Sequence, residues 1–232
     1  MSNERFQFKT FAVQQDRCAM KVGTDGVLLG AWAAGGTRIL DVGTGTGLIA
    51  LMMAQRFASA SVTAIDIDEE ACLQATANVM ASPYSDRIAI LHTALQQFDT
   101  VTCFDCIVAN PPFFINGLRN VEARRANARH TDMLSYDDLC RSAARLLTDD
   151  GEMSVVLPVD YMERFVASAV IAGLYLRRKH LVKTSFRKPP KRCLLAFCKQ
   201  RPDRLSEHVF TMFDREGEMT EWYEKLTGSF YL

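Results

Sequence analysis

Short apolar runs alternate with helix-like segments along most of this 232-residue chain. Apolar or β-branched runs predict strands in seven segments, namely 38–42, 61–67, 88–92, 105–109, 153–157, 174–182 and 193–198. Segments with helical spacing or composition follow several of these strands, at 48–57, 69–80, 136–147 and 162–172. Repeated alternation of strand and helix predicts an α/β protein with right-handed crossovers and a mostly parallel sheet that carries helices on both faces.

The last two predicted strands, 174–182 and 193–198, follow each other with only a basic, proline-containing turn between them. We therefore expect the final strand to insert antiparallel, as one arm of a hairpin. Nothing resembling a linker divides the chain, and its hydrophobic content of 48% is enough for one core, so we expect a single domain over residues 1–232. The chain has no long apolar run and no apolar segment near Met1, so we expect a cytoplasmic protein.

Seven cysteines are scattered through the chain, an odd number that favours reduced thiols over a disulfide framework. Cys103 and Cys106 form a Cys-x-x-Cys motif, which is typical of zinc or redox sites. This pair leads into an apolar strand, however, and no second pair has the spacing of a zinc finger. We therefore expect no metal site.

A glycine-rich loop follows the first predicted strand and opens a helix. Residues 41–47 read Asp-Val-Gly-Thr-Gly-Thr-Gly, and the dinucleotide fingerprint would need a sixth-position glycine where Leu48 stands. The spacing matches instead the acidic-x-Gly-x-Gly-x-Gly loop of methyltransferases, whose cofactor, S-adenosylmethionine, carries a sulfonium and an amino acid. An acidic residue before the loop suits that cofactor, and the candidate cofactor residues are Asp41, Gly43, Thr44, Gly45 and Gly47.

Asp66 lies at the end of the second predicted strand, 19 residues beyond Gly47. A carboxylate at this place can accept hydrogen bonds from both hydroxyls of a ribose. Asp68 would point the same way only if the strand continued. We therefore predict that Asp66 and the adjacent Ile67 contact the cofactor.

The sequence Asn-Pro-Pro-Phe occupies residues 110–113, at the end of the fourth predicted strand and so at the sheet edge that carries the glycine loop. The side-chain oxygen of Asn110 and the carbonyl of Pro111 can each accept one N–H of a substrate amine. Asn110 is also a candidate contact of the cofactor. Pro112 stiffens the turn, and Phe113 offers a face on which a flipped base can stack. No strong general base is needed, since the nitrogen can lose its proton after methyl transfer, and proximity supplies most of the acceleration.

With these motifs the chain resembles the class I amino-methyltransferases that carry an Asn-Pro-Pro-aromatic motif, which have a Rossmann-like sheet of seven strands. It is most similar to the bacterial members that methylate N6 of the adenine next to the anticodon of a valine tRNA. Besides the glycine loop and the catalytic motif, the resemblance rests on residues 16–26, 192–197 and 229–232. It implies that residues 1–36 cover the cofactor, that 37–232 form the catalytic core, and that the cofactor site includes Lys21, Gly23, Thr24 and Asp25.

The chain departs from this family at two points. An acidic residue usually follows the third strand near the cofactor adenine, but residues 92–96 contain none, which leaves the backbone of Ala94 and Leu95, or Gln96, as candidate contacts. Phe113 stands where the adenine enzymes commonly have tyrosine. Phenylalanine is also common in enzymes that methylate guanine N2 of ribosomal RNA, so that substrate stays an alternative.

Two further functions remain open. Methyltransferases of protein glutamine share the catalytic motif, but they usually carry a helical domain before the glycine loop, and only about 40 residues precede it here. A catalytically silent binding module is the other possibility, against which the intact loop, Asp66 and Asn110 argue.

The charges of the chain balance at 27 basic and 27 acidic residues, but they are unevenly distributed. Residues 164–202 contain eleven lysines or arginines and no acidic residue, which favours attraction to phosphate over a merely solvated face. We therefore predict a tRNA partner and favour a monomer. The predicted RNA-binding residues are Arg124, Arg125, Arg129, Arg187, Lys188, Lys191 and Arg192.

Overall fold

Eight strands form one central sheet in the computed structural model, which describes residues 4–17, 21–111 and 134–232. Their order across the sheet is β10-β8-β9-β7-β6-β3-β4-β5. These strands are β3 (Arg38–Val42), β4 (Ser61–Asp66), β5 (Ile88–His92), β6 (Phe104–Ala109), β7 (Leu147–Pro158), β8 (Tyr175–Ser185), β9 (Arg192–Cys198) and β10 (Ser206–Phe213). Seven of them correspond to the seven predicted segments. The sheet is one strand wider than predicted, because β10 joins its edge beside β8.

Strand β9 is the one antiparallel member of this sheet. It inserts between β7 and β8 and pairs antiparallel with both, whereas the other neighbouring strands pair in parallel. The predicted antiparallel insertion of the last hairpin strand is therefore confirmed.

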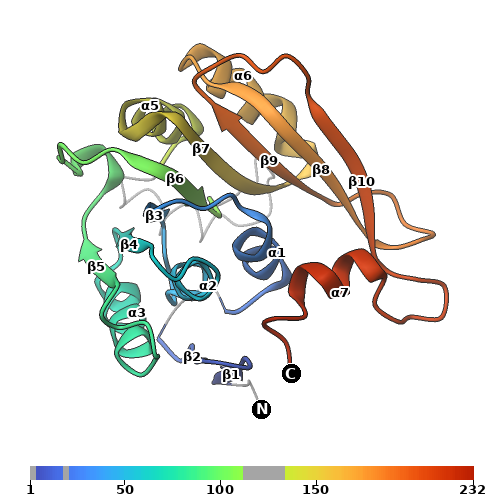
Figure 1. Ribbon diagram of the computed structural model, residues 1–232, viewed down its shortest axis with the longest axis horizontal. Helices are drawn as coiled ribbons and strands as arrows, with labels where there is room; N and C mark the ends of the chain where they lie inside the picture. The colour runs from blue at the N-terminus through green and yellow to red at the C-terminus, as the bar shows by residue number, and fades with distance from the viewer. Residues whose placement is uncertain (1–3, 18–20, 112–133) are drawn as a thin grey trace, which may run out of the picture.

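Helices cover both faces of the sheet (Figure 1). On one face, α1 (Thr24–Trp32), α2 (Leu48–Arg56), α3 (Glu69–Met80) and α7 (Glu221–Thr227) contribute to a core with side chains such as Leu51 and Tyr223. On the other face, α5 (Tyr136–Leu146) and α6 (Met162–Ile171) pack in a second core around Phe165 and Phe197. The part of the chain that the structure describes also contains two short 3₁₀ turns, at Leu95–Gln97 and Val159–Tyr161. Helices on both faces agree with the predicted α/β architecture.

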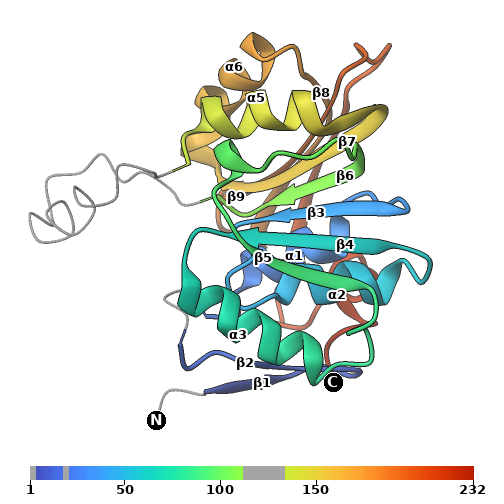
Figure 2. The same ribbon diagram turned by 90° about the vertical axis from the view of Figure 1, so that its left-hand side faces the viewer.

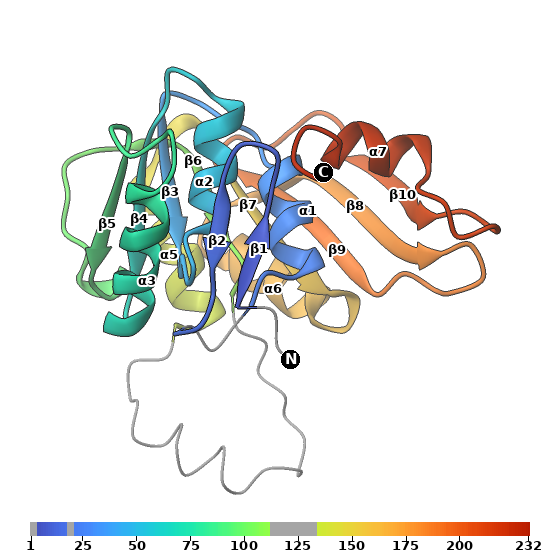
Figure 3. The same cartoon turned by 90° about the horizontal axis from the view of Figure 1, so that it is seen from below.

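The C-terminal tail lies beside the turn of a small N-terminal hairpin (Figures 1 and 3). Strands β1 (Arg5–Gln7) and β2 (Ala12–Gln14) form a small antiparallel hairpin that lies next to α3 (Figure 2). The backbone N–H of Lys9, in its turn, donates to the carbonyl of Phe230 over 2.8 Å. This contact fixes the C-terminal tail against the N-terminal hairpin.

The carboxyl ends of the parallel strands meet at one edge of the sheet. Val42, the last residue of β3, pairs with Ile65 of β4 and with Ala109 of β6, so the segments that follow these strands leave the sheet side by side. In an open α/β sheet this edge is where ligands bind. Among the described residues, no helix has the length and apolar character that crossing a membrane requires.

Candidate active site

The glycine loop between β3 and α2 leaves open space above its backbone. Gly43, Gly45 and Gly47 all have positive φ, of 71°, 54° and 82°. A Cβ atom at Gly43 or Gly45 would meet nothing within 4 Å, so a ligand can approach the backbone there. Gly47 has a different task, because a Cβ there would come within 3.3 Å of the Cβ of Ala75 in α3. The loop therefore combines a cradle for a ligand with close helix packing.

Asp41 supports this loop from below. Its side chain is fully buried, and Oδ2 accepts hydrogen bonds from Thr44 Oγ1 over 2.7 Å and from the N–H of Ala50 over 3.1 Å. Burial raises the pKa of this carboxyl to about 7, against the lowering effect of both hydrogen bonds. The other oxygen, Oδ1, is buried and has no hydrogen-bond partner among the described residues. A donor from a bound ligand would relieve the cost of that unsatisfied acceptor.

Asp66 ends β4 and bonds directly to the glycine loop. Its Oδ2 accepts the N–H of Gly45 over 2.8 Å, and its Oδ1 accepts the N–H of Asp68 over 3.1 Å. A carboxylate has about four acceptor positions, so two are left for ribose hydroxyls. Ile67 follows with 45% of its surface exposed, which provides an apolar contact beside them. Gly45, Asp66 and Ile67 were predicted as cofactor contacts from two separate motifs, and they lie together in the structure.

The residues beyond β5 lie beside Asp66. The N–H of Thr93 donates to the carbonyl of Asp66 over 2.9 Å, and the ring of His92 lies 3.0 Å from the carbonyl of Ile67. Ala94 is half-buried, whereas the side chain of Leu95 is buried in the core. Leu95 can therefore offer a ligand only its backbone. Asp68 caps α3 by accepting the N–H of Glu70 over 3.0 Å, which gives it a structural role.

Asn110 follows β6 directly, next to the glycine loop. Because Val42 pairs with Ala109, Asn110 and Gly43 leave the sheet at the same level on neighbouring strands. Asn110 is half-buried and Pro111 is buried. Pro112 and Phe113 lie outside the described residues, as do Arg124, Arg125 and Arg129.

The N-terminal segment is tied to the loop by one asparagine that the sequence analysis missed. Asn78 of α3 accepts the N–H of Gln14 over 2.8 Å and donates to the carbonyls of Gln14 and Thr46, each over 2.9 Å. One turn earlier, Gln74 accepts the N–H of Arg17 over 3.0 Å. Two buried amides spaced by four residues on one helix are a signal that the sequence did contain.

The residues from Lys21 to Asp25, which are expected to cover the cofactor, connect the N-terminal segment to α1. Lys21 and Gly23 are exposed, and Gly23 stands before the first residue of α1, where Thr24 and Asp25 form the first turn. The N–H of Val22 donates to Gln15 Oε1 over 2.7 Å, which holds this stretch against the chain that precedes it.

The basic hairpin places its turn at the same sheet edge. Pro158, the last residue of β7, pairs with Arg192, the first residue of β9, so the turn between β8 and β9 lies at the carboxyl edge. Arg187, Lys188 and Lys191 are exposed there, and no ion pair to another described residue involves them. Arg192, by contrast, forms an ion pair with Asp25.

Two other cations, on β8, form ion pairs with acidic side chains of other strands of the sheet. Arg178 pairs with Glu152 over 2.5 Å and lies over the ring of Trp32, and Lys179 pairs with Glu207 over 2.5 Å. These side chains stabilise the sheet. Three exposed cations of the hairpin, Arg187, Lys188 and Lys191, lie together in its turn.

The Cys-x-x-Cys motif has no second ligand pair around it. Cys106 is buried in β6 and donates to the carbonyl of Ala34 over 2.8 Å, while Cys103 is exposed. Burial raises the pKa of the Cys106 thiol. Within the described ranges, no group of three or more His, Cys, Asp or Glu side chains could hold a metal ion.

Comparison with known proteins gives matches over the whole chain. The model of the methyltransferase small domain family matches residues 22–165. A tRNA1(Val) (adenine(37)-N6)-methyltransferase of Phocaeicola vulgatus is 48% identical over 100% of this chain and 99% of its own length. A protein of the same name from Trichodesmium erythraeum is 42% identical, with the same coverage of this chain and of its own.

Among solved structures, a predicted O-methyltransferase from Agrobacterium tumefaciens superimposes with a TM-score of 0.67. The match covers 89% of this chain and 96% of the other, at 19% identity. At that identity the similarity establishes the fold alone.

Proposed function

Because the chain belongs to the methyltransferase small domain family, and within it to the tRNA1(Val) (adenine(37)-N6)-methyltransferases, we propose that it methylates the adenine next to the anticodon of valine tRNA at N6. Its methyl donor is S-adenosylmethionine, which supplies an electrophilic methyl group on a sulfonium. In the transfer the adenine nitrogen forms the new N–C bond, the sulfonium S–C bond breaks, and the nitrogen releases one proton to water.

The described residues fit this cofactor. Gly43 and Gly45 leave their backbone accessible, and Asp66 retains two acceptor positions for ribose hydroxyls. Ile67 provides an apolar contact for an adenine ring. The buried carboxyl of Asp41, when it is ionised, favours a cationic ligand above the loop. By resemblance, Lys21, Gly23, Thr24 and Asp25 complete the site from the N-terminal segment.

One observation carries the proposed chemistry, namely the pairing of Val42 with Ala109. This register places Asn110 beside the glycine loop, where an acceptor can orient the amine of the substrate toward the methyl donor. Asn110 accepts one N–H and the carbonyl of Pro111 accepts the other. Pro112 and Phe113 belong to the same proposal, as the rigid turn and the stacking face.

The RNA would approach over the basic turn. Arg187, Lys188 and Lys191 are exposed at the edge that carries Asn110, so phosphates near the target adenine can lie against them. We keep Arg124, Arg125 and Arg129 as further candidates, and Arg192 as a cation held in place by Asp25. We also propose that residues 1–232 act as a single domain, as a monomer in the cytoplasm.

Transfer of labelled methyl from S-adenosylmethionine to bulk tRNA that lacks the modification tests this function. We expect N6-methyladenosine, confined to valine tRNA. Methylguanosine in ribosomal RNA would contradict the choice of base and of RNA, and label on protein glutamine would contradict an RNA substrate altogether. In both cases the chain would still be a methyltransferase, and only the proposed substrate would be wrong.

A further inference from the structure

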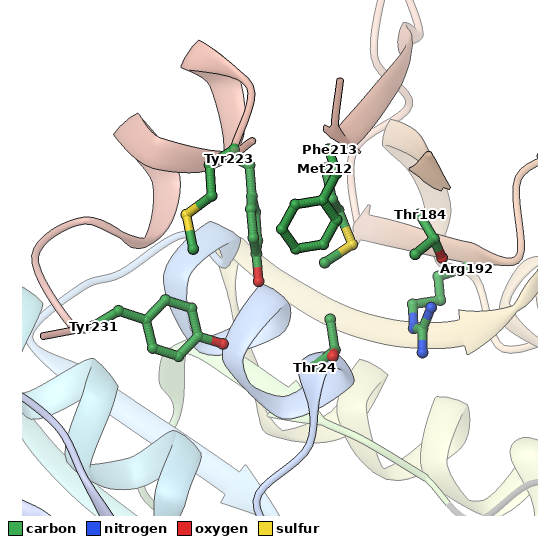
Figure 4. A pocket seen from close by; sticks show the side chains of 8 residues that line it. Thr24, Thr184, Arg192, Met212, Phe213, Tyr223 and Tyr231 are labelled. Carbon is green, nitrogen blue, oxygen red and sulfur yellow. The ribbon is translucent and has the colours of Figure 1, made fainter. Parts of the chain in front are cut away.

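A pocket of about 380 Å³ opens between α1, the β8–β9–β10 part of the sheet and α7 (Figure 4). Its volume is in the lower part of the range for small-molecule sites. The residues that line it are Thr24, Thr184, Arg192, Met212, Phe213, Met219, Tyr223 and Tyr231. They come from both ends of the chain, so the pocket forms only when the C-terminal tail packs against the core.

The lining suits a flat ring with polar edges. Three aromatic side chains face the opening, and the ring centroids of Phe213 and Tyr223 lie 5.6 Å apart. Burial, together with the neighbouring Tyr223 side chain, raises the pKa of Tyr231. Unstacked nucleobases bind to proteins through aromatic faces of this kind and through polar groups at their edges.

The charge around the pocket fits the phosphate that accompanies a base. Arg192 lines it, and Asp25 contacts the Nε atom of that guanidinium. Lys188 and Lys191 are exposed in the adjoining turn, and none of the described lining residues is acidic. A nucleotide fits this combination better than an uncharged aromatic ligand does, because phosphate contacts supply much of the affinity for nucleic acid.

The pocket adjoins the proposed cofactor site at Thr24 and lies at the sheet edge that also carries Asn110. Arg192 begins β9 and Phe213 ends β10, so both lie at the edge where Asn110 follows β6. Two to four strand spacings separate β6 from these strands, which corresponds to about 10 to 20 Å. A single strand of nucleic acid covers that distance in about three to six stacked nucleotides, and in fewer when it is extended.

We propose that this pocket binds the base of a second nucleotide, which flanks the target adenine in the RNA and is not itself methylated. The proposal rests on the RNA methyltransferase activity proposed above and adds a site that selects its substrate. It also gives a role to Tyr231, which lies in the C-terminal segment 229–232.

An abasic scan of the anticodon stem-loop of valine tRNA tests the proposal. Each nucleotide within six positions of the target adenine is replaced by an abasic one, and KM and kcat for methylation are measured. Removal of the base that enters the pocket is expected to raise KM about 10-fold, since stacking on aromatic side chains contributes this much per base.

Two variants link that nucleotide to the pocket. Phe213→Ala removes a stacking face, and Thr184→Trp fills the pocket, so either should raise KM for intact RNA about 10-fold with kcat nearly unchanged. In both variants, removal of the flanking base should then cause no further increase in KM. Val209→Ala is the matched control, because Val209 lies on the same strand, is 57% exposed and does not line the pocket.

The outcomes separate this inference from the function on which it rests. If the wild-type chain methylates no RNA, the proposed function fails, and this inference fails with it. Two outcomes would refute the pocket alone, provided that the wild-type chain methylates RNA. In the first, both folded variants keep the wild-type KM for intact RNA. In the second, removal of each flanking base raises KM in the variants as much as it does in the wild type. Thermal unfolding and calorimetric binding of S-adenosylmethionine identify a variant that has not folded.

Discussion

The guanidinium of Arg192, at the start of β9, forms an ion pair with the carboxylate of Asp25 in the first turn of α1. Only about a quarter of each side chain is exposed, at 27% and 26%. The sequence assigned Asp25 to the segment that covers the cofactor and Arg192 to the RNA-binding hairpin. The ion pair joins these two regions at one sheet edge, so a change at either residue affects both.

We expect Asp25→Ala and Arg192→Ala to be coupled in a double-mutant cycle. The double variant should lose about 0.5 to 1.5 kcal/mol less stability than the sum of the single variants, because the second change removes a charge already without its partner. Denaturant unfolding measures this. Glu221 and Lys225, an exposed pair on α7, serve as the control and should couple more weakly. Additive effects at Asp25 and Arg192 would show that the ion pair does not form in solution.

Asn110→Ala should lower the rate of methyl transfer far more than it lowers the affinity for S-adenosylmethionine. The amine then loses an acceptor that orients it, and loss of one such aligned group typically costs about 100-fold or more in kcat. Single-turnover transfer of labelled methyl measures the rate, and calorimetry with S-adenosylmethionine measures the affinity. Thr37→Ala is a control at the opposite end of the strands. A variant that keeps kcat within about twofold would remove Asn110 from the mechanism.

Periodicity predicted the strands and helices that position Asp66 and Asn110, because those segments are locally consistent. It missed α1, in which two glycines lower the helix propensity. Gly30 is required there by tertiary packing, since a Cβ would come within 2.8 Å of Met52 Sδ in α2. It also missed β10, whose residues Ser206 to Val209 are all exposed, because an edge strand need not show buried alternation.

The sequence likewise predicted only part of the candidate site. Glycine spacing and the strand-end aspartate indicated which residues surround a cofactor, since those motifs are local in sequence. The contacts of Asn78 with Gln14 and Thr46, and the pocket beside Tyr231, join residues far apart in the chain. Spacing along one helix can single out a residue such as Asn78, but it does not identify the distant residues that this side chain contacts before the fold is known.

Asp41 should make the free enzyme less stable as the pH rises from about 4 to about 7. Burial raises its pKa to about 7 in the folded chain, whereas an aspartate titrates near pH 4 when unfolded. The folded state therefore binds more protons in this window, so the free energy of unfolding falls as pH rises and levels off above it.

Asp41→Asn isolates this effect, because the amide oxygen can still accept from Thr44 and Ala50. The variant should gain stability over the wild type with increasing pH across the window and bind S-adenosylmethionine more weakly at pH 8, where the wild-type carboxylate is charged. Chemical denaturation at a series of pH values gives the difference. A difference that does not change with pH would show that Asp41 titrates normally.

The double variant Lys188→Ala, Lys191→Ala should bind RNA more weakly than the wild type. Its affinity should also depend less steeply on salt concentration. If both side chains neutralise phosphates, the slope of log K against log salt should become shallower by about 1.5. Arg201→Ala is the matched control, because Arg201 is exposed beyond the other end of β9, away from the site. Filter binding of valine tRNA at several salt concentrations measures the slope. An unchanged slope would exclude both lysines from phosphate contact.

Asn78→Ala should loosen the N-terminal segment and weaken binding of S-adenosylmethionine without affecting the chemistry of transfer. The substitution leaves the backbone groups of Gln14 and Thr46 without their partner in a buried region, at a cost of about 2 to 4 kcal/mol in stability. The cofactor should then bind more weakly, since Thr46 belongs to the glycine loop, whereas kcat at saturating cofactor should stay close to that of the wild type. Asn78→Asp is the informative comparison, because it still accepts from Gln14 but cannot donate to either carbonyl. An intermediate loss of cofactor affinity in Asn78→Asp would assign the effect to the hydrogen bonds. A destabilised Asn78→Ala that binds S-adenosylmethionine as tightly as the wild type would show that Asn78 serves the fold alone.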